Sequence, residues 1–398
     1  HSQSIVETGE RGEVKDIPYE KNGEKYIMMP GNAKKRHPVV EERTKKLTEL
    51  AENCAFNKIE MNGSEIGIIT SGTCYQYVKE VFGDSVSVYK LGMVNPLPEK
   101  SLRDFAASVK KLYVVEELDP IIENHCKTLG LSVEGKSMFS MLGEFSQETV
   151  AEAFGHEKPG TYENKTPIPV RPPMMCAGCP HRGMYYVLSK NHITVLGDIG
   201  CYTLGAQAPL FALDSTLCMG ASVSGLHGFN KAGGSESEAK SVCVIGDSTF
   251  MHSGVTGLIN IAYNGSNSTV IILDNSITGM TGHQDHAATG KTLQGELTYA
   301  INIYKLCKAI GIDSVHEINA FDIDGLKKLI KEEVAKDEIS VIITKSPCVL
   351  LKTTKVTGVC RAIPEKCKKC GMCLKPGCPA VIKQPDGTIQ IDETMCNG

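Results

Sequence analysis

Two polar residues follow two apolar runs in the middle of the chain and have the chemistry of a magnesium site. Asp247 comes directly after SVCVIG, and Asn275 comes directly after TVIILD. Both runs have the length and composition of buried parallel strands, whose carboxyl ends lie at one edge of a sheet. A carboxylate and an amide oxygen, with a backbone carbonyl just beyond, suit a hard octahedral cation that also binds phosphate oxygens. The pattern predicts a site for a magnesium-bound diphosphate.

This stretch resembles the thiamine diphosphate signature, in which Gly-Asp-Gly is followed about two dozen residues later by Asn-Asn. Here Gly-Asp-Ser stands at 246–248 and Asp-Asn at 274–275, and the two departures are at positions that do not ligate the ion. The resemblance implies that Asp247 and Asn275 bind Mg²⁺ through their side chains and Ile277 through its carbonyl. An ordinary βαβ unit with Gly-Asp turn chemistry is the alternative.

The cysteine run near the end of the chain indicates iron–sulfur chemistry. Cys367-x2-Cys370-x2-Cys373, followed by Cys378-Pro, resembles the bacterial ferredoxin run, in which three thiolates hold one four-iron cube and the fourth ligates the next. Four residues separate Cys373 from Cys378, and Cys396 stands where a second run would begin. The first cube therefore lacks its fourth thiolate within this sequence. A zinc site or reactive surface thiols are alternatives.

Four other cysteines fall in loops that one sheet edge could bring together. Cys176 and Cys179 form a Cys-x2-Cys pair, Cys201 follows a strand in GDIGCYTLG, and Cys348 lies beyond the last strand in TKSPCVLL. Their closure would place a cluster beside the diphosphate. On the residues alone, this cluster and its alternative are equally open. In the alternative, Cys176 and Cys179 form a zinc or redox-active pair, and Cys201 and Cys348 are buried, unreactive thiols.

Four histidines lie inside the same loops and are candidates to donate to a diphosphate or a substrate carboxylate. We take His181, His252 and His283 as possible catalytic residues. His181 with Arg182 is the better anion-binding pair, whereas His286 is expected to be a polar loop residue that meets water.

Composition limits what surrounds these residues. The 398 residues are 41% hydrophobic and 22% charged, which is typical of a globular chain of two or three domains. A net charge of −4, without a basic stripe, argues against binding to nucleic acid. No apolar run is long enough for a membrane span or a secretory signal, so we expect a cytoplasmic protein. Sixteen cysteines in such a chain indicate metal ligands or redox groups rather than disulfides.

The periodicity predicts an α/β protein with two parallel-sheet domains. Strand and helix patterns alternate from residue 65, and a Pro- and Gly-rich stretch separates the two domains. In the second domain, a helix is predicted over 253–264, with Ser253 as its N-cap. We expect a linker over 1–60, a first domain over 61–150, a connector over 151–175, a second domain over 176–358 and a partial iron–sulfur segment over 359–398.

Several long motifs, in order, resemble the 2-oxoacid:ferredoxin oxidoreductases, and among them the large (alpha) subunits of the indolepyruvate class. The motifs are CAGCPHRG, GDIGCYTLG, CMGASV, GDSTFMHSG, ILDNSITGMTGHQ and the cysteine run. The resemblance implies a transketolase-C-terminal-like first domain, a thiamine-diphosphate-binding second domain and a truncated ferredoxin-like segment. It also implies a four-iron cluster held by Cys176, Cys179, Cys201 and Cys348. The cofactor-binding residues that it implies are Gly246, Asp247, Ser248, Asn275, Ile277, Gly220 and Met280.

The implied cofactors are thiamine diphosphate, Mg²⁺ and 4Fe-4S clusters, and the implied reaction is CoA-dependent oxidative decarboxylation of an aryl pyruvate. The products would be an aryl-acetyl-CoA and reduced ferredoxin, and the partners a smaller beta subunit, ferredoxin, CoA and the 2-oxoacid. We expect the chain to be a fragment that is inactive alone, because a preceding domain supplies the cofactor-activating glutamate in the family. Alternatives are another 2-oxoacid:ferredoxin oxidoreductase, a non-redox thiamine diphosphate enzyme, or an electron-carrying scaffold whose α/β domains bind no cofactor.

Overall fold

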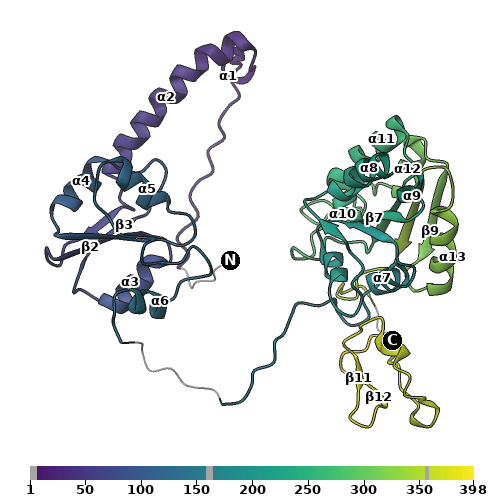
Figure 1. The fold of residues 1–398 in the computed structure, drawn as a ribbon. Helices are drawn as coiled ribbons and strands as arrows, with labels where there is room; N and C mark the ends of the chain where they lie inside the picture. Colours follow the sequence, from purple (N-terminus) through teal and green to yellow (C-terminus); the bar gives the residue numbers. More distant parts are fainter. Residues whose placement is uncertain (1–6, 158–164, 355–357) are drawn as a thin grey trace. The chain divides into compact units, whose positions relative to one another are not determined.

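The computed structural model describes residues 7–157, 165–354 and 358–398. The chain forms two compact units, His1–Pro167 and Ile168–Gly398, and each contains a sheet covered by helices (Figure 1). The predicted α/β class with parallel sheets is confirmed. Within the described ranges, no helix combines the length and apolar content that crossing a bilayer requires.

The first unit has a four-stranded sheet in the order β1-β3-β2-β4. Strand β2 runs parallel to both β3 and β4, whereas β1 is an antiparallel edge strand on β3. This edge strand lies in the stretch that the sequence assigned to a linker. Its three residues carry no buried apolar side chain, so no periodic apolar pattern marks this strand in the sequence. The strands are β1 (Lys58–Glu60), β2 (Ile66–Ser71), β3 (Ser87–Leu91) and β4 (Lys111–Val115).

Helices pack on both faces of this sheet because neighbouring strand residues point to opposite sides. Ile68 packs in one core cluster with Val78 of α3, and Ile69 packs in the other with Leu102 of α4. A polar helix, α2, lies within the stretch expected to be a linker and begins at Pro30, which occupies a first-turn position that needs no N–H donor. The helices are α1 (Gly23–Tyr26), α2 (Pro30–Glu52), α3 (Cys74–Phe82), α4 (Lys100–Ala107), α5 (Ile121–Thr128) and α6 (Gln147–Ala153).

The second unit is built on a six-stranded, fully parallel sheet in the order β6-β5-β7-β8-β10-β9. The two apolar runs that precede Asp247 and Asn275 are neighbouring central strands of this sheet, β7 and β8. Two strands were not predicted: β6 has only two residues, and β9 carries a His and a Glu that hide its strand pattern. The strands are β5 (Thr194–Gly197), β6 (Ser215–Thr216), β7 (Ser241–Gly246), β8 (Thr269–Asp274), β9 (Ser314–Asn319) and β10 (Ser340–Lys345).

Both faces of this sheet are buried, which explains the unbroken apolar runs of its central strands. Val244 and Ile271 pack toward α7 and α13, whereas Ile245 and Ile272 pack toward α8, α11 and α12. The covering helices are α7 (His181–Lys190), α8 (Ala221–Gly233), α9 (Ser235–Glu238), α10 (Asp247–Thr249), α11 (Val255–Asn264), α12 (Ile303–Ile310) and α13 (Ile323–Glu333).

The helix after β7 begins six residues earlier than predicted, directly at Asp247. It continues through a π-helical turn over Phe250–Gly254 into α11. Ser253, the expected N-cap, lies inside this turn, and its hydroxyl donates to the carbonyl of Thr249 at 3.5 Å. Asp247 is therefore the first residue of a helix, where the helix dipole favours a negative charge.

The last segment is a short antiparallel hairpin with two single-turn helices. Val381–Lys383 (β11) pairs with Ile389–Ile391 (β12), and turns at Pro364–Lys366 and Met372–Leu374 flank the first cysteines of the run. We call residues 358–398 the tail.

Candidate functional site

Two strand ends converge at the carboxyl edge of the second sheet. Strand β7 pairs in parallel with β8, and Gly246 is directly opposite Leu273. The residues that follow each strand, Asp247 on one side and Asn275 on the other, therefore leave the sheet at the same edge, where open α/β sheets bind their ligands.

The Asp247 carboxylate is almost fully buried, with 2% of the residue exposed. Its two oxygens accept one backbone N–H each, from Ser248 and from Ser276, both at 2.8 Å. Ser276 has a positive φ of 61°, an uncommon conformation for a non-glycine residue, and this brings its N–H onto the carboxylate. A carboxylate has about four lone-pair positions, so this fixed side chain keeps acceptor capacity for a cation.

His286 is buried beside Asp247, contrary to the expectation that it meets water. Its Nε2 atom lies 3.2 Å from Oδ2 of Asp247 but makes no aligned hydrogen bond within the described part of the chain. The loop after β8 folds back over the sheet edge, which the sequence did not indicate. A buried ring nitrogen is thus available to a group bound at this carboxylate.

A second carboxylate lies next to the first. Burial and the charge of Asp247 raise the pKa of Asp274 to about 6, and Nζ of Lys345 lies 4.0 Å from Oδ2 of Asp274. Two close carboxylates disfavour simultaneous ionisation unless a cation compensates them. The donor set at this edge therefore fits a divalent ion.

His181 orients the side chain of Asn275. The two side-chain nitrogens, Nδ2 of Asn275 and Nε2 of His181, are 3.4 Å apart, and Oδ1 of Asn275 accepts from the N–H of Ile277 at 3.4 Å. Burial lowers the pKa of His181 to about 4, so its imidazole is neutral and accepts from the amide. His181 is the first residue of α7, and the Cys-Pro turn before it sets its position.

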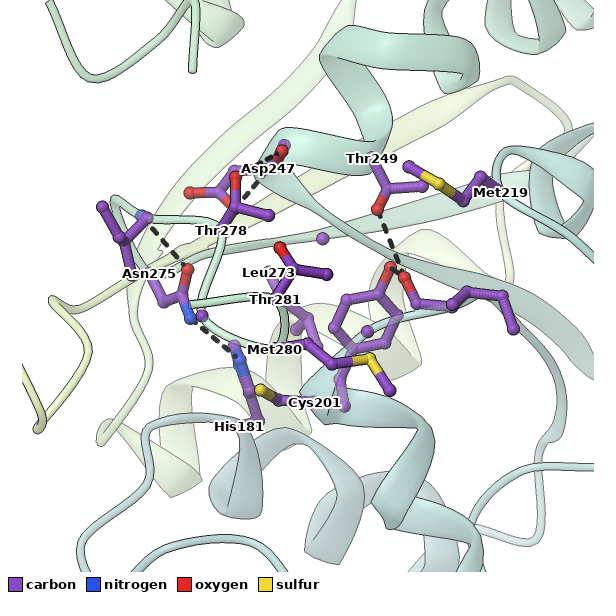
Figure 2. Close-up of a pocket in the computed structure, with 17 residues that line it drawn as sticks. His181, Cys201, Met219, Asp247, Thr249, Leu273, Asn275, Thr278, Met280 and Thr281 are labelled. Atoms are coloured by element: carbon purple, nitrogen blue, oxygen red, sulfur yellow. Dashed lines mark hydrogen bonds between the residues drawn. The ribbon is translucent and has the colours of Figure 1, made fainter. Parts of the chain in front are cut away.

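These side chains border one pocket, which is partly open to solvent. Figure 2 shows Asp247, Asn275 and His181 along one side of it, with Met219 across from them. The residues of the predicted site that line the pocket are Gly246, Asp247, Ser248, Asn275, Ile277, Met280, His181 and Cys201. The lining residues that were not predicted are Ile199, Gly200, Tyr202, Met219, Thr249, Leu273, Thr278, Gly279 and Thr281.

Three of the predicted catalytic and cofactor-binding residues, His252, His283 and Gly220, lie outside the pocket lining. His252 and His283 are exposed. Gly220 is adjacent to the lining residue Met219, and an added Cβ there would lie 2.7 Å from Oγ of Ser253, so this glycine is required for packing. Its N–H donates to Oδ1 of buried Asp198 at 3.0 Å.

Arg182 does not form the predicted anion-binding pair with His181. The guanidinium donates to four backbone carbonyls and does not line the pocket. A sequence pattern cannot show this, because the acceptors come partly from the distant tail.

Tyr202 explains why position 246 is a glycine. An added Cβ at Gly246 would lie 2.5 Å from the Tyr202 ring, whose hydroxyl donates to the carbonyl of Ile199 at 2.8 Å. The glycine of the signature therefore lets an aromatic side chain close the pocket against the end of the strand.

The four cysteines predicted for a proximal cluster approach the same edge. Burial, and after it the thiols of Cys348 and Cys176, raise the pKa of Cys201. Burial raises the pKa of Cys179 to about 12, and the same two thiols add to this rise. Yet within the described residues no three His, Cys, Asp or Glu side chains are close enough together to hold a metal ion. The four thiols are the donors that an iron–sulfur cluster requires, and they lie near enough for the charge of one to raise the pKa of another.

A sixth cysteine of the tail, Cys360, was not predicted as part of a site. Its backbone N–H donates to Sγ of Cys396 at 3.3 Å. Backbone N–H groups of Gly398 and Cys360 lower the pKa of Cys396, and the charge of Cys396 raises the pKa of Cys360. Cys360 also borders the hollow that contains Cys367, Cys370 and Cys373. It lies outside the repeated spacing, so no motif could identify it.

The buried histidine gives a prediction for pH dependence. We expect His181→Gln to destabilise the cofactor-free chain by about 1–2 kcal/mol at pH 7, because Gln packs less well around the Asn275 amide. Folded His181 has its pKa lowered to about 4, below the unfolded value of 6.5, so the wild type loses stability as the pH falls between these values. Gln does not titrate, so the difference should shrink as the pH falls below about 6. Urea unfolding of both proteins from pH 7 to pH 5 measures it, and a pH-independent difference would contradict this account.

Comparison with known proteins identifies the class first. Residues 198–344 match the family described as thiamine pyrophosphate enzyme, C-terminal TPP binding domain. This range contains Asp247, Asn275 and most of the pocket. The α/β core of the second unit is therefore similar to the C-terminal domains of thiamine pyrophosphate enzymes.

Whole-chain relatives identify the family. Indolepyruvate oxidoreductase subunit IorA of Archaeoglobus fulgidus is 32% identical over 428 residues, which cover 100% of this chain and 68% of the relative. The IorA subunit of Thermococcus kodakarensis is 34% identical over 437 residues, which cover 99% of this chain and 67% of that relative. The chain belongs to the IorA family of indolepyruvate oxidoreductase subunits and is thus a subunit of an oxidoreductase.

Solved structures give a weaker likeness. A 2-oxoglutarate:ferredoxin oxidoreductase from Magnetococcus marinus shares 18% identity at a TM-score of 0.37, over 47% of this chain and 66% of that chain.

Proposed function

We propose that this chain is the thiamine-diphosphate-binding, iron–sulfur subunit of a ferredoxin-dependent enzyme that oxidatively decarboxylates aryl pyruvates. The products are an aryl-acetyl-CoA, CO₂ and reduced ferredoxin. The smaller beta subunit completes the enzyme, and CoA and a 2-oxoacid of the indolepyruvate class are its substrates. Family membership, the cofactor-binding domain and the cysteine sets support this proposal.

One observation carries the redox part of the proposal: the cysteine set adjoins the cofactor pocket. The N–H of Cys348 donates to the carbonyl of Asn275 at 2.9 Å, and Cys201 lines the pocket itself. A non-redox decarboxylase has no use for thiols placed against its magnesium ligand. In an electron-transferring enzyme, this contact would hold Cys348, a predicted cluster ligand, next to the cofactor pocket.

The residues at the sheet edge fit magnesium diphosphate. Asp247, Asn275 and the carbonyl of Ile277 would hold the ion, and His286 is placed to donate to a phosphate oxygen. Thiamine diphosphate, when bound, supplies the nucleophilic carbon and the electron sink for decarboxylation. The chain's own residues would fix the diphosphate, and neutral His181 holds the Asn275 amide nitrogen, so that the amide oxygen would be available to a cation.

The thiol groups fit iron–sulfur clusters by their chemistry. Cys176, Cys179, Cys201 and Cys348 would hold the proximal cluster, and the tail would hold the outer ones. The residues that would bind in the tail are Cys367, Cys370, Cys373, Cys378 and Cys396. Burial keeps Cys179 protonated in the metal-free chain, so assembly of a cluster there releases a proton.

The side chains at the mouth of the pocket support an aryl substrate. Met219 and Met280 are 43% and 60% exposed, and both contribute to the lining. Methionine is polarizable and flexible, and its sulfur packs favourably against aromatic rings. A flat indole or phenyl group therefore has suitable partners.

Substrate class is tested with the chain and its partner subunit under anaerobic conditions. With CoA and methyl viologen, indolepyruvate should reduce the dye with a kcat/KM at least about tenfold above that of pyruvate or 2-oxoglutarate, since an apolar pocket discriminates by roughly this factor. A preference for 2-oxoglutarate would overturn the aryl assignment. Release of the aldehyde without dye reduction would instead indicate a non-redox thiamine diphosphate enzyme.

A further inference from the structure

Tyr202 reaches the pocket from a segment that belongs to neither β7 nor β8. It lies in a 3₁₀ helix over Cys201–Ala206, shortly after β5, and only 5% of it is exposed. Its side chain packs in the same core cluster as Val244 of β7 and lines the pocket. An aromatic side chain from a third segment thus approaches the edge at which Asp247 and Asn275 leave the sheet.

The hydroxyl of Tyr202 fixes the end of β7. The last residues of β7 extend beyond the part of the strand that pairs with β5, and a buried N–H needs an acceptor there. The Tyr202 hydroxyl accepts the N–H of Gly246 and donates to the carbonyl of Ile199 at 2.8 Å. Thr249 donates to the same carbonyl at 3.3 Å (Figure 2). Because Gly246 immediately precedes Asp247, this hydroxyl helps to set where the carboxylate begins.

The ring of Tyr202 contacts the side chain that orients Asn275. The rings of Tyr202 and His181 meet at 88°, with their centroids 6.0 Å apart, which is a favourable arrangement for two aromatic rings. His181 is only 4% exposed, and its Nε2 lies 3.4 Å from Nδ2 of Asn275. Without the tyrosine ring, the imidazole would have space beside it and would hold the amide less firmly.

Two glycines leave room for this ring. An added Cβ at Gly200 or at Gly246 would overlap the ring of Tyr202. The two glycines have φ of 168° and −76°, which other residues also adopt. Space for the ring, and not backbone conformation, therefore accounts for glycine at both positions.

We infer that Tyr202 is a positioning residue for both side-chain ligands of the predicted magnesium site, an inference that rests on the proposed function. Its hydroxyl acts on Asp247 through Gly246, and its ring acts on Asn275 through His181. The two effects can be separated by substitution. Tyr202→Phe removes the hydroxyl and keeps the ring, whereas Tyr202→Leu removes both.

Hydrogen exchange in the cofactor-free full chain tests the two effects one at a time. Exchange of the Gly246 amide should accelerate about tenfold in both variants, since both lose the oxygen that accepts it. Exchange of the Asn275 side-chain amide should accelerate about tenfold in Tyr202→Leu and much less in Tyr202→Phe, since only Leu frees the His181 ring. An unchanged Gly246 amide in Tyr202→Phe, or an unchanged Asn275 amide in Tyr202→Leu, would overturn the inference.

Cofactor binding tests the consequence for the site. In calorimetric titrations with Mg²⁺, Tyr202→Phe should bind thiamine diphosphate about tenfold more weakly than the wild type, because partners that orient a metal ligand are worth 10–100-fold. With the metal chelated, this difference should disappear, because no ion then needs oriented ligands. Wild-type affinity in Tyr202→Phe, or an equal loss with and without Mg²⁺, overturns the inference.

Tyr89→Phe is the matched control. Tyr89 is a buried tyrosine of the first unit, 2% exposed, whose hydroxyl shares a hydrogen bond with Oγ of Ser101 at 2.7 Å. Its substitution removes a comparable buried hydroxyl and should leave cofactor affinity unchanged. A wild-type chain that does not bind thiamine diphosphate with Mg²⁺ overturns the proposed function instead, and the exchange experiment, which needs no cofactor, still decides the inference.

Discussion

Asp247→Asn should weaken magnesium-dependent binding of thiamine diphosphate by at least about 100-fold, because even partners that only orient a metal ligand are worth 10–100-fold. Asp247 is the one charged ligand in the predicted set, and its carboxylate is held rigidly by the N–H groups of Ser248 and Ser276. Asn keeps the shape and one acceptor oxygen but removes the negative charge. Isothermal titration of the cofactor into the chain at fixed Mg²⁺ measures the change.

Asp274→Asn is the matched control for this experiment. It removes a neighbouring, partly buried carboxylate and introduces the residue that the thiamine diphosphate signature carries at this position. Cofactor affinity should stay within about threefold of the wild type, because residue 274 does not ligate the ion in that signature. If both variants bind the cofactor equally poorly, the negative charge of this region attracts the magnesium, and Asp247 is not a specific ligand.

Cys348→Ser should remove about four iron atoms per chain after anaerobic reconstitution, since a cubane loses stability without its fourth thiolate. The broad absorbance near 400 nm should fall in proportion. This residue is informative because its N–H bonds to Asn275, so the variant also tests whether the cluster borders the cofactor site. Serine preserves that backbone contact, and thiamine diphosphate binding should therefore be retained.

Cys54→Ser provides the control for the iron measurement. Cys54 is a half-buried free cysteine of the first unit, which contains none of the predicted cluster ligands. Its replacement should leave the iron content unchanged. Equal iron loss in both variants would show that substitution of any thiol impairs reconstitution and would remove the argument for Cys348 as a ligand.

The central part of the fold could be predicted because its signals are local. Strands such as Ser241–Gly246 are buried on both faces and are therefore continuous apolar runs, and Asp247 and Asn275 follow from which strand ends a parallel sheet places together. Strands β1 and β6 carried no such signal, since short edge strands expose most of their residues.

What could not be predicted depends on contacts between distant segments. His286 was expected in water, yet the loop after β8 returns it to Asp247. Arg182 was expected to bind an anion, yet its acceptors are carbonyls that include two from the tail. Cys360 has no motif spacing and is recognised only by its position beside Cys396. Residue type and spacing therefore predict a site well only where local sequence determines which groups meet, and not where distant segments form it.

The central claim is that Asp247 and Asn275 bind one magnesium ion, which in turn holds the diphosphate of the cofactor. The most direct test is calorimetric titration of thiamine diphosphate into the wild-type chain, first with Mg²⁺ and then with the metal chelated. We expect saturable binding to one site with Mg²⁺ and at least about a tenfold loss of affinity without it, because phosphate oxygens and carboxylates repel one another unless a cation lies between them. Equal affinity in both conditions would contradict the account.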